Sequence, residues 1–215
     1  MSTSFKFYRI YHYRPDKQPR DLDTLIASKL FSSTIDRLND PFEFNALREL
    51  ADYPDKLMEH QNAGVTCFCR SLTNPLLWSH YAASHVGFAI GYDATHPYFG
   101  GDQGYGKRFL LDVRYEDVAP SIERYGVDEI AMAAMLTKPT CWAYEQEVRL
   151  IKQQGNELID VPRDMVKEIV FGAHMPDGRI AEITNAVKAA GICAEFTQML
   201  FLDEGYGVKP KQLSV

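Results

Sequence analysis

Hydrophobic and polar positions alternate with a period of two over much of the chain, and this pattern predicts β-strands. The predicted strands cover residues 5–13, 29–35, 64–71, 86–93, 108–118, 167–172 and 194–201. Successive side chains of a strand point to opposite faces, so this alternation is typical of strands with one buried face. The sequence therefore predicts a sheet at the centre of the fold.

Apolar positions spaced three and four residues apart predict helices between these strands. The helical segments are residues 21–29, a stretch ending near residue 61, and residues 74–84, 120–137 and 179–191. Asn74 and Pro75 are residue types preferred at a helix N-cap and first position. We predict an α+β fold: a single mixed domain over residues 1–205 with a central, mainly antiparallel sheet flanked by helices, and a loose C-terminal tail over residues 206–215.

Composition narrows the class of function. The chain has 23 Lys and Arg against 29 Asp and Glu, a net charge of −6, which argues against nonspecific duplex binding but allows a local basic groove. No apolar run approaches the roughly 20 residues of a membrane span, so we expect a cytoplasmic protein with no membrane association. The cysteines lack paired CxxC spacing, so we expect reduced thiols and no metal at Cys67, Cys69, Cys141 and Cys193.

Three charges interrupt an apolar and aromatic run in the stretch CWAYEQEVRLI, residues 141–151. A strand would place Glu145, Glu147 and Arg149 on one face, whereas a helix would pair Glu145 with Arg149 for only about 0.3–0.5 kcal/mol. The apolar, β-branched end of the stretch favours the strand. Its two carboxylates would lie roughly 7 Å apart, and either Arg149 or a cationic ligand could neutralise them.

The segment NDPFE, residues 39–43, predicts a tight turn. Asp40 can cap the turn through its side chain, and Pro41 fixes its own φ. We expect Asp40 to accept hydrogen bonds from backbone amides and Glu43 to reach a basic side chain. Asn39 and Lys138 belong to the same candidate cleft or structural set.

Aromatic and basic residues in two other segments are candidate ligand contacts. Trp78 and His80 form either a hydrogen-bonded structural corner or one wall of a cleft, and we expect them, with Tyr81, to contact the Glu145 and Glu147 face. His12 and Arg14 lie on one face of the first strand. That strand is either an edge covered by tyrosines or a contact for an anionic or ribose-bearing ligand.

Several motifs in this order resemble a widespread bacterial family of unknown function that is often found near phage-defence genes. The resemblance covers roughly residues 8–172 and is most specific in the NDPFE segment, in LWSHY at residues 77–81, and in Lys138 with Trp142, Glu145, Glu147 and Arg149. The family supplies no activity. His12 departs from the lysine expected there.

A second resemblance is to ADP-ribosyltransferase folds, which carry a His or Arg, a Ser-bearing strand and a catalytic Glu in that order. His12 or Arg14, then Ser32, then Glu145-x-Glu147 occur in the same order. The resemblance implies NAD as cofactor. Glu147 would stabilise oxocarbenium character and Glu145 would orient a nucleic-acid or protein acceptor.

In that transferase hypothesis, the remaining candidates hold the cofactor. Ser32 would support the ribose, Arg14 with His12 the pyrophosphate side, and Trp78 or Tyr81 beside His80 the nicotinamide. The protein would then be a toxin or defence effector.

Two alternatives remain open from the residues alone. One is a metal-dependent nuclease in which Asp40, Glu43 and Glu145 or Glu147 gather magnesium beside Lys138. The other is a non-catalytic defence-system binding or partner module in which the same charges form a structural network. The sequence specifies neither the acceptor nor an oligomeric state.

Overall fold

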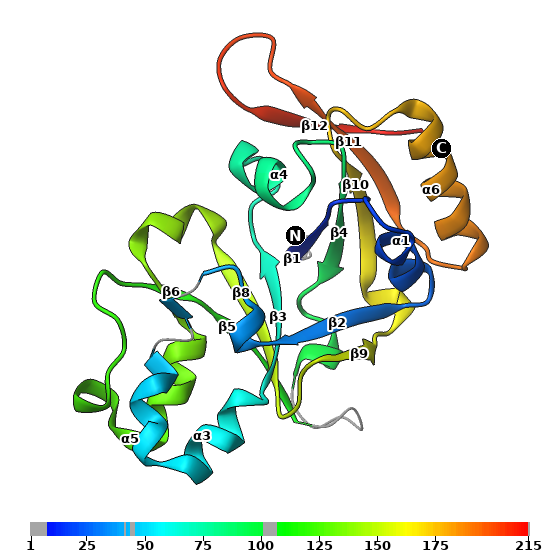
Figure 1. Ribbon diagram of the computed structural model, residues 1–215. Helices are drawn as coiled ribbons and strands as arrows, with labels where there is room; N and C mark the ends of the chain where they lie inside the picture. The colour runs from blue at the N-terminus through cyan, green and yellow to red at the C-terminus, as the bar shows by residue number, and fades with distance from the viewer. Residues whose placement is uncertain (1–7, 41, 44–45, 101–106, 215) are drawn as a thin grey trace, which may run out of the picture. The chain divides into compact units, whose positions relative to one another are not determined.

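The computed structural model describes residues 8–40, 42–43, 46–100 and 107–214 of the chain. It has a mixed α and β architecture with a mainly antiparallel sheet and several helices, which confirms the predicted fold class at this level (Figure 1). Residues 5–7 of the first predicted strand lie outside the described residues. Within the described part of the chain, no helix combines the length and apolarity that a membrane crossing requires.

Contacts within the chain gather its residues into two compact units. Unit 1 comprises Met1–Leu30, Phe68–His96 and Asp160–Val215, and unit 2 comprises Phe31–Cys67 and Pro97–Ile159. The chain passes between the units at four points. Three lie inside strands, β2 (Lys29–Thr34), β3 (Gly64–Cys69) and β9 (Glu157–Asp160), and the fourth lies between His96 and Pro97. Because three of the four passages are strands rather than linkers, the sequence carries no clear mark of the division. The prediction of a single domain over residues 1–205 stays a prediction.

Unit 1 contains a sheet with helices packed against it. Its elements are β1 (Arg9–Arg14), α1 (Pro19–Ile26), α4 (Pro75–Tyr81), β4 (Phe88–Asp93), η5 (Arg163–Met165), β10 (Val166–Phe171), α6 (Asp177–Ala189), β11 (Glu195–Phe201) and β12 (Val208–Gln212). Strands follow the order β12-β11-β10-β4-β1, antiparallel except for the parallel pair β10 and β11 that α6 connects. Buried residues such as Ile10, Ile90 and Ile169 form its core because they share one face of adjacent strands.

Unit 2 combines a small sheet with helices that cover it. Its elements are η1 (Ile35–Arg37), η2 (Ala46–Asp52), α3 (Pro54–Gln61), η3 (Pro97–Phe99), β5 (Arg108–Asp112), β6 (Arg114–Tyr115), α5 (Ile122–Met135), β7 (Thr137–Lys138), η4 (Thr140–Glu145) and β8 (Glu147–Lys152). Strand β8 pairs with β5 and β3, and β3 pairs with β2. The apolar face of α5 packs with Leu47, Leu50, Val65 and Ile151 into one buried cluster.

The C-terminal segment differs from the loose tail that the sequence predicts. Residues Val208–Gln212 form β12, which pairs antiparallel with β11 from Phe201↔Val208 to Thr197↔Gln212. The strand lies at the end of the sheet order, so its residues after Val208 are exposed. Polar residues and Pro210 are tolerated on such an edge, which is why the segment lacks the apolar alternation of a buried strand.

The loop between β8 and β9 depends on a close backbone approach at Gly155. A Cβ at this position would lie 2.4 Å from the Ser33 carbonyl oxygen and 2.8 Å from Gly64 Cα. We predict that Gly155→Ala lowers the free energy of unfolding by about 1–3 kcal/mol, the usual cost of overpacking. Urea unfolding measures this change.

Gly178→Ala is the matched control, because a Cβ there meets nothing within 4 Å and the residue lies in α6. This control should be neutral or stabilising by up to about 1 kcal/mol. Equal losses in both variants would contradict the steric explanation.

Candidate functional site

The stretch with three charges is not one continuous strand. Residues Thr140–Glu145 form the 3-10 helix η4, Gln146 adopts a left-handed conformation with φ of 45°, and β8 begins at Glu147. The predicted single strand over residues 141–151 is therefore wrong in its first half. The left-handed residue ends η4 before β8 begins, so Glu145 reaches the other charges from the end of a 3-10 helix rather than from the same strand face.

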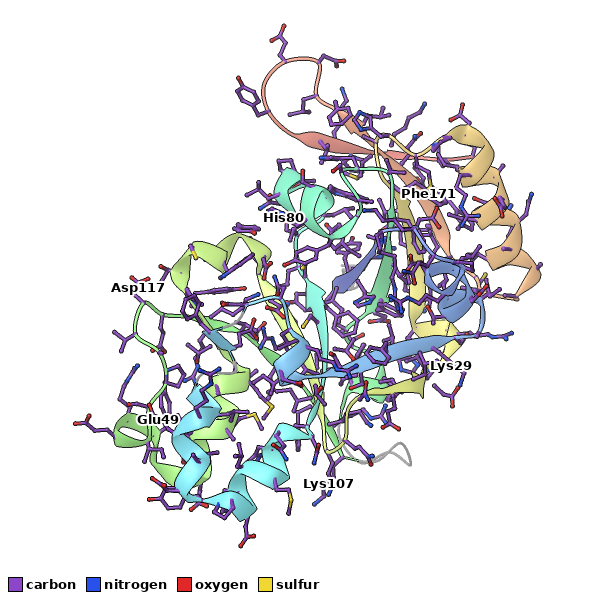
Figure 2. The ribbon with its side chains drawn as sticks, in the orientation of Figure 1. Lys29, Glu49, His80, Lys107, Asp117 and Phe171 are labelled. Carbon is purple, nitrogen blue, oxygen red and sulfur yellow. The ribbon has the colours of Figure 1, made fainter. Side chains whose placement is uncertain are left out.

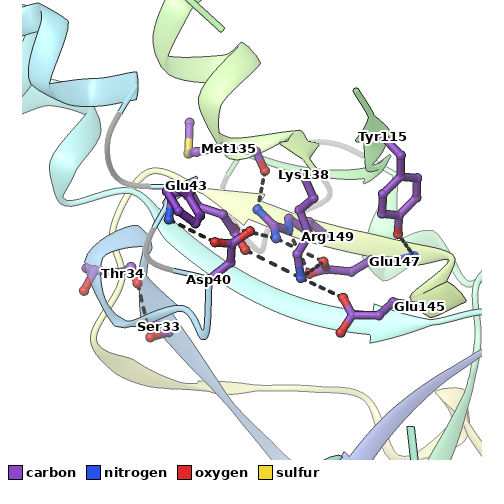
Figure 3. Close-up of polar contacts among 11 residues, drawn as sticks. Ser33, Thr34, Asp40, Glu43, Tyr115, Met135, Lys138, Glu145, Glu147 and Arg149 are labelled. Carbon is purple, nitrogen blue, oxygen red and sulfur yellow. Dashed lines mark hydrogen bonds and ion pairs between the residues drawn. The ribbon is translucent and has the colours of Figure 1, made fainter. Parts of the chain in front are cut away.

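Five charged side chains meet inside unit 2 and form a buried charge network, defined here as Glu43, Lys138, Glu145, Glu147 and Arg149 (Figure 3). Lys138 Nζ lies 2.6 Å from a Glu145 oxygen, 3.1 Å from Glu147 Oε2 and 3.6 Å from Glu43 Oε1. All five residues are at most 4% exposed. Such burial is stable only when each charge has partners.

Arg149 uses every edge of its guanidinium. Its Nε and NH2 donate to the two oxygens of Glu147 at 2.8 and 3.0 Å, and its NH1 donates to the Met135 carbonyl oxygen at 2.7 Å. NH2 also lies 2.6 Å from Glu43 Oε2. The bidentate pair with Glu147 is the strongest geometry available to an arginine and a carboxylate. Arg149 thereby joins β8, the end of α5 and the NDPFE turn.

Three carboxylates face two cations in this network, and the pKa values divide accordingly. Burial raises the pKa of Glu147, but the charge and hydrogen bonds of Arg149, with Lys138, outweigh it and lower this pKa to about 2. Burial dominates at Glu43 and raises its pKa, although Arg149 and Lys138 oppose the change. Glu43 is therefore the carboxyl that most readily keeps a proton and balances the network's charge.

Three neighbouring side chains contact or influence members of the buried charge network. The Glu147 amide donates to the Tyr115 hydroxyl oxygen at 2.8 Å, and burial raises the pKa of Tyr115 to about 12. Lys138 Nζ lies 4.8 Å from the centre of the Trp142 ring, a cation–π contact. The Cys67 thiol also helps to lower the pKa of Glu147. The candidate residues Lys138, Trp142, Glu147 and Arg149 thus do come together.

The NDPFE turn has the predicted contacts. Asp40 is 2% exposed and its Oδ1 accepts a hydrogen bond from the Phe42 amide at 2.9 Å, while the Glu43 amide donates to the Asp40 carbonyl oxygen at 3.2 Å. Glu43 reaches Arg149 and Lys138, as expected. Asn39 precedes this turn, and Pro41 lies outside the described residues. The turn therefore carries Glu43 into the network.

The remaining predicted contacts are distributed over both units. Ser32 lies in β2 of unit 2 and is fully buried. Its hydroxyl packs against Gly64, since a Cβ added to that glycine would lie only 2.4 Å from the hydroxyl oxygen. His12 and Arg14 lie on β1 of unit 1, where the His12 ring packs on Phe68 with centroids 5.7 Å apart. The expected contact between the LWSHY helix and the Glu145 and Glu147 face involves residues of different units and stays a prediction.

Trp78 is held as a structural corner of unit 1. It is fully buried, its indole nitrogen donates to the Leu72 carbonyl oxygen at 2.7 Å, and Tyr13 meets it edge-on with centroids 5.1 Å apart. Asn74 caps α4 as predicted by accepting from the Leu76 amide at 2.9 Å. His80 is exposed on α4 (Figure 2), and its ring lies 6.2 Å from that of Tyr81. These contacts support the hypothesis that Trp78 is part of a hydrogen-bonded structural corner.

Unit 2 also contains a cleft of about 1090 Å³ that the sequence did not reveal. Basic and amide side chains form part of its lining: Arg37, His60, Gln61, Asn62, Lys107, Lys152, Gln153, Gln154 and Asn156. Apolar side chains form the rest: Met58, Ala63, Phe109, Met132, Met135 and Ile151. Its acidic lining residue is Asp36. The residues come from five separate chain segments, and no single segment carries a recognisable motif.

The loop between β8 and β9, at one side of the cleft, is fixed by three hydrogen bonds. Lys152 Nζ donates to the Gln154 carbonyl oxygen at 2.6 Å, the Gly155 amide donates to the Asn62 carbonyl oxygen at 2.7 Å, and Arg37 NH1 donates to Asn156 Oδ1 at 2.7 Å. The side chains of Gln153 and Gln154 remain exposed. A fixed backbone with available amide groups is a preorganised binding surface, which costs little ordering when a ligand binds.

The charge network and the cleft share structural elements. Met135 is one of the residues that line the cleft, and its carbonyl oxygen accepts a hydrogen bond from Arg149. Ile151, another lining residue, lies on β8 two positions after Arg149 and therefore on the same strand face. The network consequently supports one wall of the cleft.

Comparisons with known proteins identify no relative of the chain. No protein-family model, curated protein or solved structure matches the chain. Neither resemblance stated from the sequence gains support from them, and the ADP-ribosyltransferase-like fold stays a hypothesis. Among the described residues, no three His, Cys, Asp or Glu side chains are grouped so that they could hold a metal ion.

The opposite pKa directions of Glu43 and Glu147 predict opposite effects of substitution. The raised pKa of Glu43 adds stability that is present below its ordinary pKa of 4.5 and is lost as pH rises through the folded value. Glu43→Gln, which resembles the protonated carboxyl, should therefore be neutral or stabilising at pH 7. Urea unfolding between pH 4 and 8 measures the difference.

Glu147→Gln is the matched comparison. The lowered pKa of Glu147 gives stability that is present above 4.5 and is lost as pH falls toward about 2. This variant should lose about 3 kcal/mol at pH 7, and the loss should shrink below pH 5. A Glu43→Gln variant as unstable as Glu147→Gln at pH 7 would contradict this charge balance.

Proposed function

We propose that the protein is a ligand-binding module whose unit 2 cleft binds a small anionic ligand of the nucleotide class. The observation that carries the proposal is the lining of the cleft, which places basic and amide groups beside an exposed apolar wall. A nucleotide combines a phosphate, a sugar and a planar base. Basic groups suit the phosphate, whereas an apolar wall with neighbouring amide groups suits the base. The volume of about 1090 Å³ suits a ligand as large as a dinucleotide.

The phosphate would be held by the basic side chains of the cleft. The side chains of His60 and Lys107 make no hydrogen bond or ion pair within the described part of the chain, so their donors are available. Arg37 uses NH1 for Asn156, and its other nitrogens can serve a ligand. Lys152 already contacts Glu157 and so contributes less.

The base would lie on the apolar wall. Phe109 is 51% exposed and Met58 60% exposed, although both are apolar. A stacked aromatic ring contributes about 1–3 kcal/mol per base, and methionine sulfur packs well against ring edges. Gln153 and Gln154 can then donate and accept hydrogen bonds at the edge of the base.

The charge of the chain favours a small ligand over a long polyanion. The net charge is −6, and a nucleic acid would bring many phosphates close to this acidic protein. A mononucleotide or dinucleotide needs only the local basic groups of the cleft. NAD, the cofactor expected from the sequence, belongs to this class.

The transferase and nuclease hypotheses require more than the buried charge network offers. Glu147 is 4% exposed and its charge is paired with Arg149 and Lys138, so a substrate would have to displace these partners before meeting the carboxylate. A magnesium ion bound by the same carboxylates would likewise have to displace Lys138. We therefore assign the network a supporting role and place ligand binding in the cleft.

Thermal shift and calorimetry with ATP, ADP, AMP, adenosine, NAD and inorganic phosphate test the proposal. We predict stabilisation by the phosphorylated nucleotides and a weaker effect of adenosine. Phe109→Ala should raise the dissociation constant about tenfold or more, since about 1.4 kcal/mol of stacking corresponds to a factor of ten. Lys107→Ala should weaken the phosphorylated ligands more than adenosine.

Two residues of unit 2 outside the cleft lining give matched controls. Phe31 is 39% exposed on β2, and Lys56 pairs with Asp128 on the surface. Phe31→Ala and Lys56→Ala should leave the affinities unchanged. The proposal fails if no nucleotide shifts the melting temperature, or if the control variants weaken binding as much as the cleft variants.

A further inference from the structure

We infer that Arg14 in unit 1 is a second, independent ligand contact that binds an oxyanion, either a phosphate or a carboxylate. Among the described residues, its Nε and NH2 are buried and have no hydrogen-bond partner. These two atoms form the edge with which arginine grips two oxygens of one oxyanion. The geometry thus leaves a binding edge unfilled inside the fold.

Two other arginines show how this chain fills the same edge. Arg149 directs Nε and NH2 to the two oxygens of Glu147. Arg179 directs Nε and NH2 to the two oxygens of Asp16 at 2.8 and 2.6 Å. Arg14 buries Nε and NH2 but has no carboxylate on this edge, so an external oxyanion would complete the same arrangement.

The carboxylates nearest in sequence are committed to other partners. Asp16 is held by Arg179, and Asp21 Oδ2 accepts from the Lys17 and Gln18 amides at 3.0 and 3.1 Å to cap α1. Asp21 and Tyr92 favour the charged guanidinium only at a distance, while Arg20 opposes it. Arg14 therefore carries a charge that its own chain does not pair.

Burial makes this unpaired charge costly. Arg14 ends β1 opposite Phe88, and burial lowers the pKa of its guanidinium. A buried cation without a counterion destabilises a fold, whereas a bound anion removes that cost. The residue was also a candidate for anion binding from its position in the sequence, and its unfilled edge is the structural reason to keep that role.

Melting temperatures in increasing phosphate, sulfate, acetate or malonate, at constant ionic strength set with chloride, test the inference. We expect at least one of these oxyanions to raise the melting temperature of the wild type by about 5–10 °C at 100 times its dissociation constant. Phosphate and sulfate acting without the carboxylates would identify a phosphate-type ligand. The reverse would identify a carboxylate ligand.

Arg14→Met is the decisive variant and Arg20→Met is its control, because Arg20 is a nearby, exposed arginine. Without oxyanions, Arg14→Met should melt no lower than the wild type, and it should lose the oxyanion response that Arg20→Met retains. If Arg14→Met does not fold, Arg14→Lys, which keeps the charge but lacks the fork, should show a weakened response. Measuring each Arg14 variant also in the Lys107→Ala background, where phosphate binding in the unit 2 cleft is weakened, separates the two sites.

Two results would overturn the inference. One is that none of the oxyanions stabilises the wild type beyond the chloride control. The other is that Arg14→Met or Arg14→Lys responds to the oxyanions as the wild type does.

Discussion

A fully buried guanidinium needs an oxygen for each of its edges, and this requirement at Arg149 shapes unit 2. Glu147 fills one edge, the Met135 carbonyl oxygen another, and Glu43 approaches from the NDPFE turn. Lys138, in β7, then pairs with Glu145 and Glu147. Breaking the pair of Glu147 and Arg149 leaves a buried charge unpaired, which costs several kcal/mol, so the segments that carry them are fixed together.

This constraint bears on function through the elements that the network and the cleft share. Arg149 and Ile151 lie on one face of β8, and Met135 belongs to both the network and the lining. A rigid wall lets exposed side chains such as Phe109 and Gln153 meet a ligand with little ordering cost. In the function that we propose, the buried carboxylates support a binding surface, which is the role that the non-catalytic hypothesis from the sequence gives them.

Local chemistry was predictable from the sequence where it depends on residues close together in the chain. Asn74 caps α4, Asp40 closes its turn, and Glu43 meets a basic partner, all as the residue types indicate. The left-handed conformation of Gln146 and the edge strand β12 were not predicted. Gln146 is not a residue type typical of that conformation, and the polar residues of β12 lack the apolar alternation of a strand. The cleft was missed because its residues converge only through tertiary packing, and the unfilled edge of Arg14 becomes visible only once its surroundings are known.

A double-mutant cycle on Glu147 and Arg149 tests the supporting role of the network most directly. Melting curves and NAD consumption would be measured for the wild type, Glu147→Gln, Arg149→Met and the double variant. The account predicts that each single change costs about 3 kcal/mol, that the double variant recovers much of this loss, and that NAD is not consumed by any of them. Single variants that keep wild-type stability, together with NAD consumption by the wild type that Glu147→Gln abolishes, would contradict it and favour the transferase.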